Sequence, residues 1–130
     1  MGAARPRAVV LDAGALVAFE RNDRRVRRLI EFAAELGGSL HVPAGVVAQV
    51  WRHGARQARL GRLLKSGLLG VRDLDLDEAR AAGALCGVTK TADVVDASVV
   101  LLARRHRAAV LTSDPADLRR LDARLVLVTC

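Results

Sequence analysis

Residues 7 to 22 read RAVVLDAGALVAFERN, and this stretch decides the fold. RAVVLDA (7–13) is a short apolar run that predicts a strand, and GALVAFERN (14–22) predicts the helix that follows it. Asp12 stands where the strand ends. A strand that runs directly into a helix is the unit from which α/β proteins are built.

The same alternation continues to the end of the chain. Short apolar runs predict further strands at 39–43, 68–75, 108–114 and 123–130. Helical patterns predict helices at 23–38, 44–52, 56–67, 77–88, 91–103 and 115–122. Strands that alternate with helices indicate parallel strands covered by helices on both faces. We expect one α/β domain over residues 1–130, with a mainly parallel central sheet.

Composition restricts the class of protein. The 21 basic residues exceed the 14 acidic residues and give a net charge of +7, which favours a polyanionic partner, nucleic acid first. The aromatic residues are Phe19, Phe32 and Trp51, so aliphatic side chains must form the core. So few aromatics argue against a protein that stacks many bases on aromatic platforms.

The location of the protein is also constrained. The sequence has no apolar run long enough to span a bilayer, so we expect no membrane association. Asp12 interrupts the apolar stretch near the N-terminus, and we therefore interpret the start of the chain as folded protein rather than a signal peptide. Cys86 and Cys130 lack the spacing of metal ligands and fit free thiols in a cytoplasmic protein.

Four aspartates are predicted to share one cleft. Asp12 and Asp114 each close a strand, and the carboxyl ends of parallel strands gather reactive groups at one edge of the sheet. Asp93 and Asp96 begin the apolar helix TADVVDASVVLLA, which precedes the Asp114 strand. If this helix starts at the same edge, all four carboxylates point into the same crevice.

Helix capping is the alternative reading of these acids. Asp114 could cap a helix whose first residue is Pro115, with Asp117 near the positive end of the helix dipole, and Asp93 could cap its own helix. Asp96 lies inside a helix among apolar neighbours, and Asp12 has no obvious cationic partner. Capping accounts for one or two of the acids but not for four at neighbouring sites.

Clustered carboxylates repel one another and need a compensating charge. Arginines could supply it, but oxygen-only clusters are the natural sites of Mg²⁺ or Mn²⁺. A hard cation with few protein ligands keeps water molecules that phosphate oxygens can replace, and it activates water for hydrolysis. We therefore predict a divalent metal that compensates the aspartates.

Basic residues recur at helical spacing in the middle of the chain. Their intervals are four, three, three and three, which predicts a stripe along one helix formed by Arg52, Arg56, Arg59, Arg62 and Lys65. The stripe is either a solvated helix face or a track for a phosphate backbone. Further arginine clusters occur at 24–28 and 104–107.

Four motifs together resemble the PIN domain, and most closely the VapC-type toxins of bacterial toxin–antitoxin pairs. They are VVLDAGALVAF (9–19), VPAGVVAQVWR (42–52), DVVDASVVLLA (93–103) and VLTSDPADL (110–118). The resemblance covers essentially the whole chain. It implies a three-layer α/β/α sandwich and a metal-dependent endoribonuclease that cuts RNA.

The resemblance also implies roles for individual residues. The metal-binding acids of the family match Asp12, Asp96 and Asp114, and Asp93 fits an additional catalytic acid found in part of the family. Hydroxyl positions beside the late strand-end acid match Thr112 and Ser113. A small antitoxin and a homodimer are the expected partners.

One residue departs from the family pattern. The family usually has a glutamate on the central helix, and this chain has Gln49 there, which brings no negative charge. Asp93 or Asp117 could supply the missing charge. The alternative is a degenerate PIN domain that binds RNA or a protein without catalysis. An aspartyl phosphotransferase is disfavoured, because it would usually repeat an acid at position 14, which is glycine.

Overall fold

The central sheet consists of five parallel strands. In the computed structural model, which describes residues 8–130, these are β1 (Ala8–Leu11), β2 (Ser39–Pro43), β3 (Leu69–Arg72), β4 (Ala109–Thr112) and β5 (Leu127–Thr129). Their order across the sheet is β3-β2-β1-β4-β5, and every neighbouring pair is parallel. The predicted parallel sheet is confirmed. Arg7 and the start of the chain, which we interpreted as folded, lie outside the described residues.

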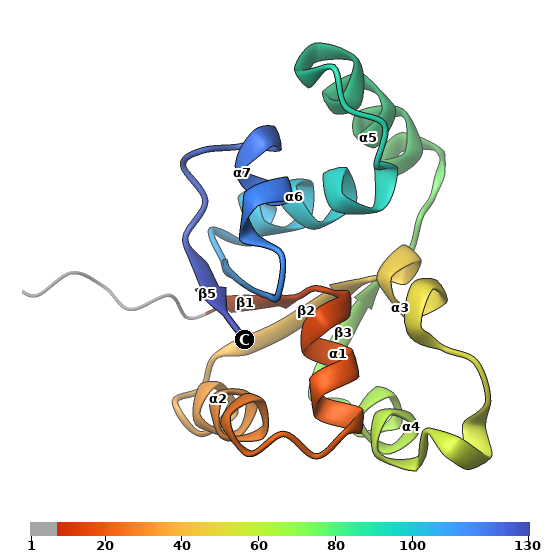
Figure 1. The fold of residues 1–130 in the computed structure, drawn as a ribbon, viewed down its shortest axis with the longest axis vertical. Coiled ribbons are helices and arrows are strands. Elements are labelled where there is room, and N and C mark those ends of the chain that lie inside the picture. Colours follow the sequence, from red (N-terminus) through yellow and green to blue (C-terminus); the bar gives the residue numbers. More distant parts are fainter. Residues whose placement is uncertain (1–7) are drawn as a thin grey trace, which may run out of the picture.

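Helices cover both faces of the sheet (Figure 1). One layer holds α1 (Ala13–Glu20), α2 (Arg24–Glu35) and α4 (Ala58–Lys65), and the opposite layer holds α5 (Leu76–Thr89), α6 (Val94–His106) and α7 (Pro115–Leu121). The short helix α3 (Ala44–Val50) follows the carboxyl end of β2 and contacts both α1 and α6. The predicted three-layer α/β/α sandwich is therefore confirmed. No helix within residues 8–130 is long and apolar enough to cross a membrane.

Helix α6 is apolar on most sides because it is enclosed on most sides. Its residues Val99, Val100 and Leu102 are buried in the core that also contains the strands β1, β2 and β4. Its Ala97 packs instead with Ala82 and Cys86 of α5. The largest fully buried side chains of the described chain are all leucine or valine, as the scarcity of aromatics predicts.

The chain changes direction across the sheet between β1 and β4. It proceeds from β1 to β2 and β3 on one side, and β4 and β5 then add on the other side of β1. Leu11 lies in register with Leu111, and the backbone N–H of Asp12 donates to the carbonyl of Leu111 at 3.0 Å. In open parallel sheets such a switch point leaves a crevice at the carboxyl ends of the strands. Asp12 and Asp114 flank this crevice.

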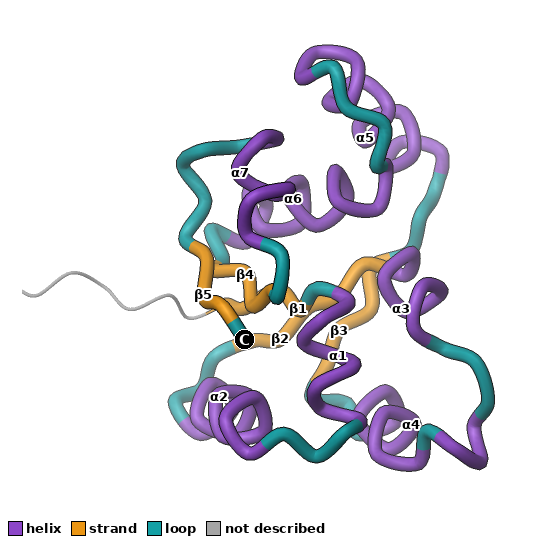
Figure 2. The backbone as a smooth tube through the Cα atoms, viewed as in Figure 1, coloured by secondary structure: helices purple, strands orange, loops and turns teal. Residues whose placement is uncertain are grey.

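The basic stripe does not lie on one helix, which corrects the prediction. Helix α3 ends at Val50, a loop follows (Figure 2), a 3₁₀ turn η1 (Gly54–Arg56) comes next, and α4 begins at Ala58. The side chain of Gln57 bonds to backbone groups of the loop and replaces the hydrogen bonds of a continuous helix. Arg52 and Arg56 therefore precede α4, and the α4 residues of the stripe are Arg59, Arg62 and Lys65.

Strands β3 and β5 are shorter than predicted because side chains form a cap or a turn within the predicted ranges. The predicted strand 68–75 ends at Arg72, and Asp75 instead caps α5 by accepting from the backbone N–H of Glu78 at 2.8 Å. The predicted strand 123–130 begins at Leu127, since the Asp122 carboxylate accepts from the N–H of Arg124 at 2.9 Å and forms a turn there.

Candidate functional site

Asp12 is buried at the junction of β1 and α1. Its side chain is the N-cap of α1, and Oδ1 accepts from the backbone N–H of Ala13 at 2.8 Å. Only 6% of Asp12 is exposed, and Asp12 forms no ion pair with a basic side chain of residues 8–130. Helix capping, which the sequence suggests for Asp93 and Asp114, is therefore also a role of Asp12.

Thr112 links the two strand-end aspartates. Its hydroxyl donates to Oδ2 of Asp12 at 2.8 Å, and the hydroxyl oxygen Oγ1 of Thr112 accepts from the backbone N–H of Asp114 at 2.9 Å. Thr112 is fully buried. The ends of β1 and β4 are therefore fixed relative to each other by one side chain. The resemblance marked Thr112 as a hydroxyl position, but a sequence gives no direct signal of this bridge.

Gly14 lets the start of α1 approach the loop after β4 closely. A Cβ atom at position 14 would lie 2.0 Å from Oγ and 2.7 Å from Cβ of Ser113. Such contacts are far inside van der Waals distance, so any larger residue must displace the Ser113 loop. Sequence reasoning used Gly14 only to argue against a phosphotransferase and missed this role.

Asp93 and Asp96 lie at the first turn of α6, as predicted. The carboxylate of Asp93 caps the helix by accepting from the backbone N–H groups of Val95 and Asp96, both at 3.0 Å. The Asp96 side chain is half-buried and has no such partner among the described residues. Capping thus describes Asp93 but leaves Asp96 unexplained.

The pKa of Asp96 shows how close the acids are. Burial and then the charges of Asp93 and Asp12, followed by those of Asp117 and Asp114, raise the pKa of Asp96 to about 7. Four carboxylates from three segments of the chain therefore act on one side chain: the start of α1, the start of α6 and the start of α7. Within residues 8–130 no basic side chain forms an ion pair with Asp96 to offset them.

Asp114 and Asp117 belong to the turn that leads into α7. Asp114 occupies the N-cap position before Pro115, but its side chain makes no capping hydrogen bond. The charge of Asp117 raises the pKa of Asp114, with smaller contributions from desolvation and Asp12, while Arg120 lowers it. Arg120 lies 3.9 Å from the Asp117 carboxylate. Capping by Asp114, the alternative interpretation of this residue, is absent, and Asp114 is exposed.

A groove of about 530 Å³ opens beside these acids. It runs between the end of α5, the start of α6 and α7. Asp93, Asp96 and Asp117 line it, together with the basic side chains of Lys90 and Arg120. The groove thus presents carboxylates next to cations, an arrangement that suits a metal ion and a phosphate in contact with each other.

The donor atoms fit a hard divalent cation, but the ligands are not already gathered around one point. The acids supply oxygen donors alone, which Mg²⁺ and Mn²⁺ prefer. Among residues 8–130, no group of three or more histidine, cysteine, aspartate or glutamate side chains is arranged to hold a metal ion. Both carboxylate oxygens of Asp12 are engaged in hydrogen bonds. Binding would therefore require the aspartates to turn towards the ion.

The remaining predicted residues lie around the crevice or away from it. Ser113 is exposed and contacts the start of α1 at Gly14. Gln49 is exposed near the end of α3 and is not among the residues that line the groove. The basic residues from Arg52 to Lys65 are exposed on the loop after α3, on η1 and on α4.

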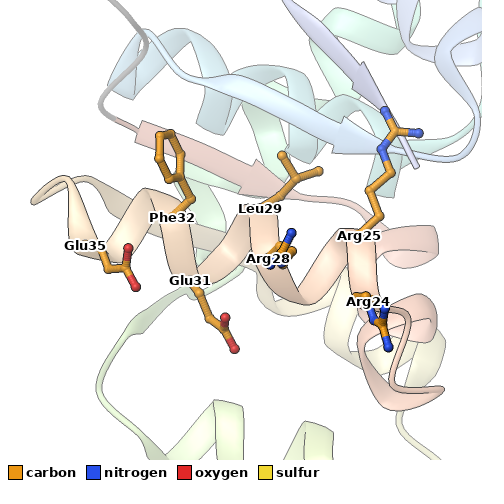
Figure 3. A pocket seen from close by; sticks show the side chains of 7 residues that line it. All are labelled: Arg24, Arg25, Arg28, Leu29, Glu31, Phe32 and Glu35. Carbon is orange, nitrogen blue, oxygen red and sulfur yellow. The ribbon is translucent and has the colours of Figure 1, made fainter.

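A second hollow, of about 740 Å³, lies along α2 and away from the acids. Figure 3 shows Phe32 and Leu29 on this helix, together with Arg24, Arg25 and Arg28 from the first arginine cluster. This hollow is larger than the acidic groove, but its two carboxylates, Glu31 and Glu35, share it with three arginines and lie on α2, away from the switch point. We therefore place the candidate site at the switch point.

The fold and its crevice define a parallel α/β protein with an acidic site at the switch point of the sheet. The sequence matches the family model of the PIN domain over residues 9–124, and the chain belongs to the PIN domain family. A search of curated proteins found no match.

Solved structures with a similar fold come from toxin–antitoxin systems. VapBC2 from Rickettsia felis, bound to a DNA fragment from its promoter, matches with a TM-score of 0.71 and 15% identity, covering 95% of this chain and 98% of that one. A toxin–antitoxin complex from Klebsiella pneumoniae matches with a TM-score of 0.68 and 16% identity, covering 93% and 96%. FitAcB from Neisseria gonorrhoeae gives 0.59 and 15%, covering 93% and 96%. At these identities the similarity establishes the fold.

Proposed function

We propose that this protein is a metal-dependent endoribonuclease and the toxin of a toxin–antitoxin pair. PIN domains are typically nucleases, and the structural relatives are chains of toxin–antitoxin complexes. The observation that carries the proposal is the group of acids around Asp96: burial, and then the charges of Asp93, Asp12, Asp117 and Asp114, raise the pKa of Asp96 to about 7. Asp96 itself forms no ion pair within residues 8–130. A cation bound at this switch point would relieve the repulsion between the carboxylates and would thereby stabilise the folded protein.

Three aspartates are proposed as metal ligands and the others as their support. Asp12, Asp96 and Asp114 would hold Mg²⁺ or Mn²⁺, and Asp93 and Asp117 would add negative charge. A cation held there would supply Lewis-acid chemistry, polarising the phosphodiester and activating water for hydrolysis. Thr112 orients Asp12 through its hydrogen bond to Oδ2. Near neutral pH, without a cation, the Asp96 carboxyl holds a proton for part of the time, which the ion would displace.

The substrate is proposed from charge. A protein with a net charge of +7 and an acidic crevice attracts a polyanion through the rest of its surface. Lys90 and Arg120 line the groove beside the acids, and we propose that they contact phosphate oxygens. Arg52, Arg56, Arg59, Arg62 and Lys65 would contact the phosphate backbone farther away.

Cleavage of RNA with a metal-ligand variant tests the proposal. Purified protein should cut RNA in Mn²⁺ or Mg²⁺ and stop in EDTA. Asp12→Asn should lower the rate by about 100-fold or more, since a lost ligand removes several kcal/mol of charge stabilisation. Asp73→Asn, an exposed acid in the loop after β3, is the matched control and should retain the rate. Cleavage that continues in EDTA would refute the metal mechanism.

Gln49 favours a second candidate, a PIN domain that binds without cutting. The side chain has no charge, and it is exposed on α3 rather than inside the groove. Gln49→Glu separates the two candidates. A large gain in rate identifies a weakened nuclease, while RNA binding without cleavage in both forms identifies a binding protein.

The same relatives support the proposed partners. Because the similar structures include toxin–antitoxin complexes, we propose a small antitoxin that covers the crevice, a homodimer, and action in the cytoplasm. Co-purification of a neighbouring gene product that abolishes RNA cleavage would support the antitoxin. Light scattering on the purified protein measures the oligomer.

A further inference from the structure

The loop after α3 carries the single tryptophan of the chain at the surface. Trp51 is 36% exposed and follows directly on the last residue of α3. An indole presents a large apolar surface, so its partial exposure removes much of the stabilisation that complete burial would give. The position therefore calls for an explanation beyond packing.

The loop holds Trp51 in one place. The backbone N–H of Trp51 donates to the carbonyl of Val47 at 2.8 Å and closes the last turn of α3. On the following side, Oε1 of Gln57 accepts from the N–H groups of Arg52 and His53 at 2.7 and 3.0 Å. The same Gln57 donates to the carbonyl of Val50 at 2.7 Å. One side chain thus fixes the backbone on both sides of the tryptophan.

Two glycines form the floor beneath the indole. A Cβ atom at Gly54 would lie 3.4 Å from Cζ2 of Trp51, and one at Gly61 would lie 3.6 Å from Cη2. A methyl group at either position would touch the six-membered ring, so at Gly54 and Gly61 the ring lies beside η1 and α4 with no side chain of these residues in between. The ring is supported on one side while the residue stays partly exposed, which is the arrangement of a rigid platform.

The surroundings of the platform are mostly basic, and the Glu20 carboxylate is engaged by the backbone N–H of Leu60 in α4 at 2.7 Å. Arg52, Arg56, Arg59, Arg62 and Lys65 belong to the same loop, η1 and α4, and none of them forms an ion pair among residues 8–130. Arg72, Arg104 and Arg105, by contrast, all pair with carboxylates. Arg52 donates to the carbonyls of Ala48 and Trp51, and Arg59 donates to the carbonyl of Glu20. Because no carboxylate of residues 8–130 neutralises these side chains, their positive charges remain available to phosphate groups.

Helix α3 connects this platform to the acidic crevice. It starts where β2 ends, at the carboxyl edge of the sheet, and a Cβ atom at Gly45 would lie 3.4 Å from Val95, the neighbour of Asp96. Seven residues of helix extend over about 10 Å. Figure 1 shows α3 between the first turn of α6 and the loop that leads to α4. Trp51 is therefore one short helix away from the proposed metal ligands.

We propose that Trp51 is a stacking platform for an unpaired base of the RNA, one or more nucleotides away from the bond that is cut; this rests on the proposed function. Base stacking on an aromatic ring combined with backbone contacts to basic residues is how proteins hold single-stranded nucleic acids. The chain has too few aromatic residues to form many stacking platforms, but Trp51 can form one. The site selects a single-stranded segment and fixes its position relative to the crevice.

The tryptophan reports on its own binding. The chain contains no tyrosine and one tryptophan, so its intrinsic fluorescence comes from Trp51. We would titrate the full chain in EDTA with a short 2′-O-methyl oligoadenylate, which is not cleaved, and follow both tryptophan emission and the anisotropy of a fluorescein label on the oligonucleotide. Stacking should quench the emission over the same concentration range in which the anisotropy rises.

Variants separate stacking from packing. Trp51→Leu keeps an apolar side chain above Gly54 and Gly61 but removes the platform, and it should weaken binding by about 5- to 150-fold. Trp51→Phe keeps a smaller ring and should bind with intermediate affinity. Phe32→Ala is the matched control, because Phe32 is 50% exposed beside arginines on α2 (Figure 3) and should bind as the parent does. Circular dichroism confirms that each variant is folded.

The outcomes distinguish this inference from the proposed nuclease. Folded Trp51→Leu that binds the oligonucleotide as tightly as the parent, or anisotropy that rises without quenching, overturns the stacking site even if Mn²⁺-dependent cleavage is present. Quenching and weakened binding of Trp51→Leu support the site even if no cleavage is found. Unchanged RNA binding together with lost binding to a co-purified protein would assign the platform to a protein partner and would also overturn the inference.

Discussion

Replacing Asp96 by asparagine should stabilise the metal-free protein above neutral pH. Burial, followed by the charges of Asp93, Asp12, Asp117 and Asp114, raises the pKa of Asp96 to about 7. An aspartate in an unfolded chain has a pKa of about 3.9. The folded protein therefore holds this proton more tightly than the unfolded chain does. Asp96 favours folding fully below about pH 4, and this contribution is lost as the pH rises to about 7.

The magnitude follows from the difference between the two pKa values. Without solvent screening, the difference between a pKa of about 3.9 and one of about 7 corresponds to a loss of about 4 kcal/mol in unfolding free energy above pH 7. The Asp96 carboxylate is only half-buried, so solvent screening reduces the figure to about 2 kcal/mol. Asparagine also gives up the favourable interaction of a negative charge with the first turn of α6, about 0.5 kcal/mol. Asp96→Asn should therefore gain about 1.5 kcal/mol, or about 5 °C in Tm.

Thermal unfolding in EDTA measures this gain. The Tm difference between Asp96→Asn and the parent should be small at about pH 4, should increase up to about pH 7, and should stay constant above it. Asp73→Asn, on the exposed loop after β3, is the control and should show no such dependence. Mg²⁺ at ten times its dissociation constant should stabilise the parent by about 1.4 kcal/mol and the variant by less. Equal Tm values for Asp96→Asn and the parent at about pH 8 would refute the proposed repulsion.

Three further predictions concern other parts of the molecule. Thr112→Val should destabilise the protein by about 1–3 kcal/mol in urea unfolding and slow RNA cleavage, because it removes the hydroxyl between Asp12 and the loop after β4; wild-type stability would contradict the bridge. Glu78→Gln should lower the unfolding free energy by about 2 kcal/mol, because the buried Glu78 carboxylate pairs with Arg72 at 3.0 Å and with Arg105 at 2.6 Å. A change below about 0.5 kcal/mol would show that these two ion pairs contribute little to stability. Burial and then the charge of His106, whose ring stacks on that of His41 at 3.7 Å, lower the pKa of His41. His41 therefore supports folding above about pH 6.5 and loses that contribution as the pH falls. His106→Gln should reduce the loss of stability between about pH 7 and pH 5.5, and identical pH profiles of variant and parent would rule this out.

The sheet and the positions of its acids could be predicted because both follow from local patterns. Apolar runs alternate with helical periods, which requires parallel strands, and parallel strands bring their carboxyl ends to one edge. Asp12 and Asp114 end such runs, so their shared crevice follows without knowledge of tertiary contacts. Asp96 stood out because it is an acid in a helix that is apolar on most sides.

What the sequence did not reveal depends on contacts between distant residues. The helical spacing of the basic residues predicted one helix through Arg52 and Arg56, but the side chain of Gln57 bonds to the backbone of the loop and ends that helix. No periodicity signals such a contact. Likewise, the cap of α4 comes from Glu20, whose carboxylate accepts from the N–H of Leu60 at 2.7 Å across 40 residues of sequence.

The four acids also differ in ways that only the structure separates. Capping and metal binding are alternatives in the sequence, yet Asp12 both caps α1 and raises the pKa of Asp96 through its charge. Asp93 caps its helix, whereas Asp114 occupies a capping position without making the bond. A side chain's hydrogen-bond partner depends on its rotamer and on neighbouring segments, which a pattern of residue types does not specify.

The width of the crevice depends on glycine at position 14, because its side chain is a hydrogen atom and even a methyl group there would overlap Ser113. Because Ser113 occupies the volume that a side chain at position 14 would need, the chain segments that carry the first and the last acid can sit in direct contact. Enlarging this residue would act as a wedge: it would push the two carboxylates apart while leaving both in the sequence. Loss of function can therefore arise here with every acidic residue intact, and a survey of acidic positions alone would not detect it.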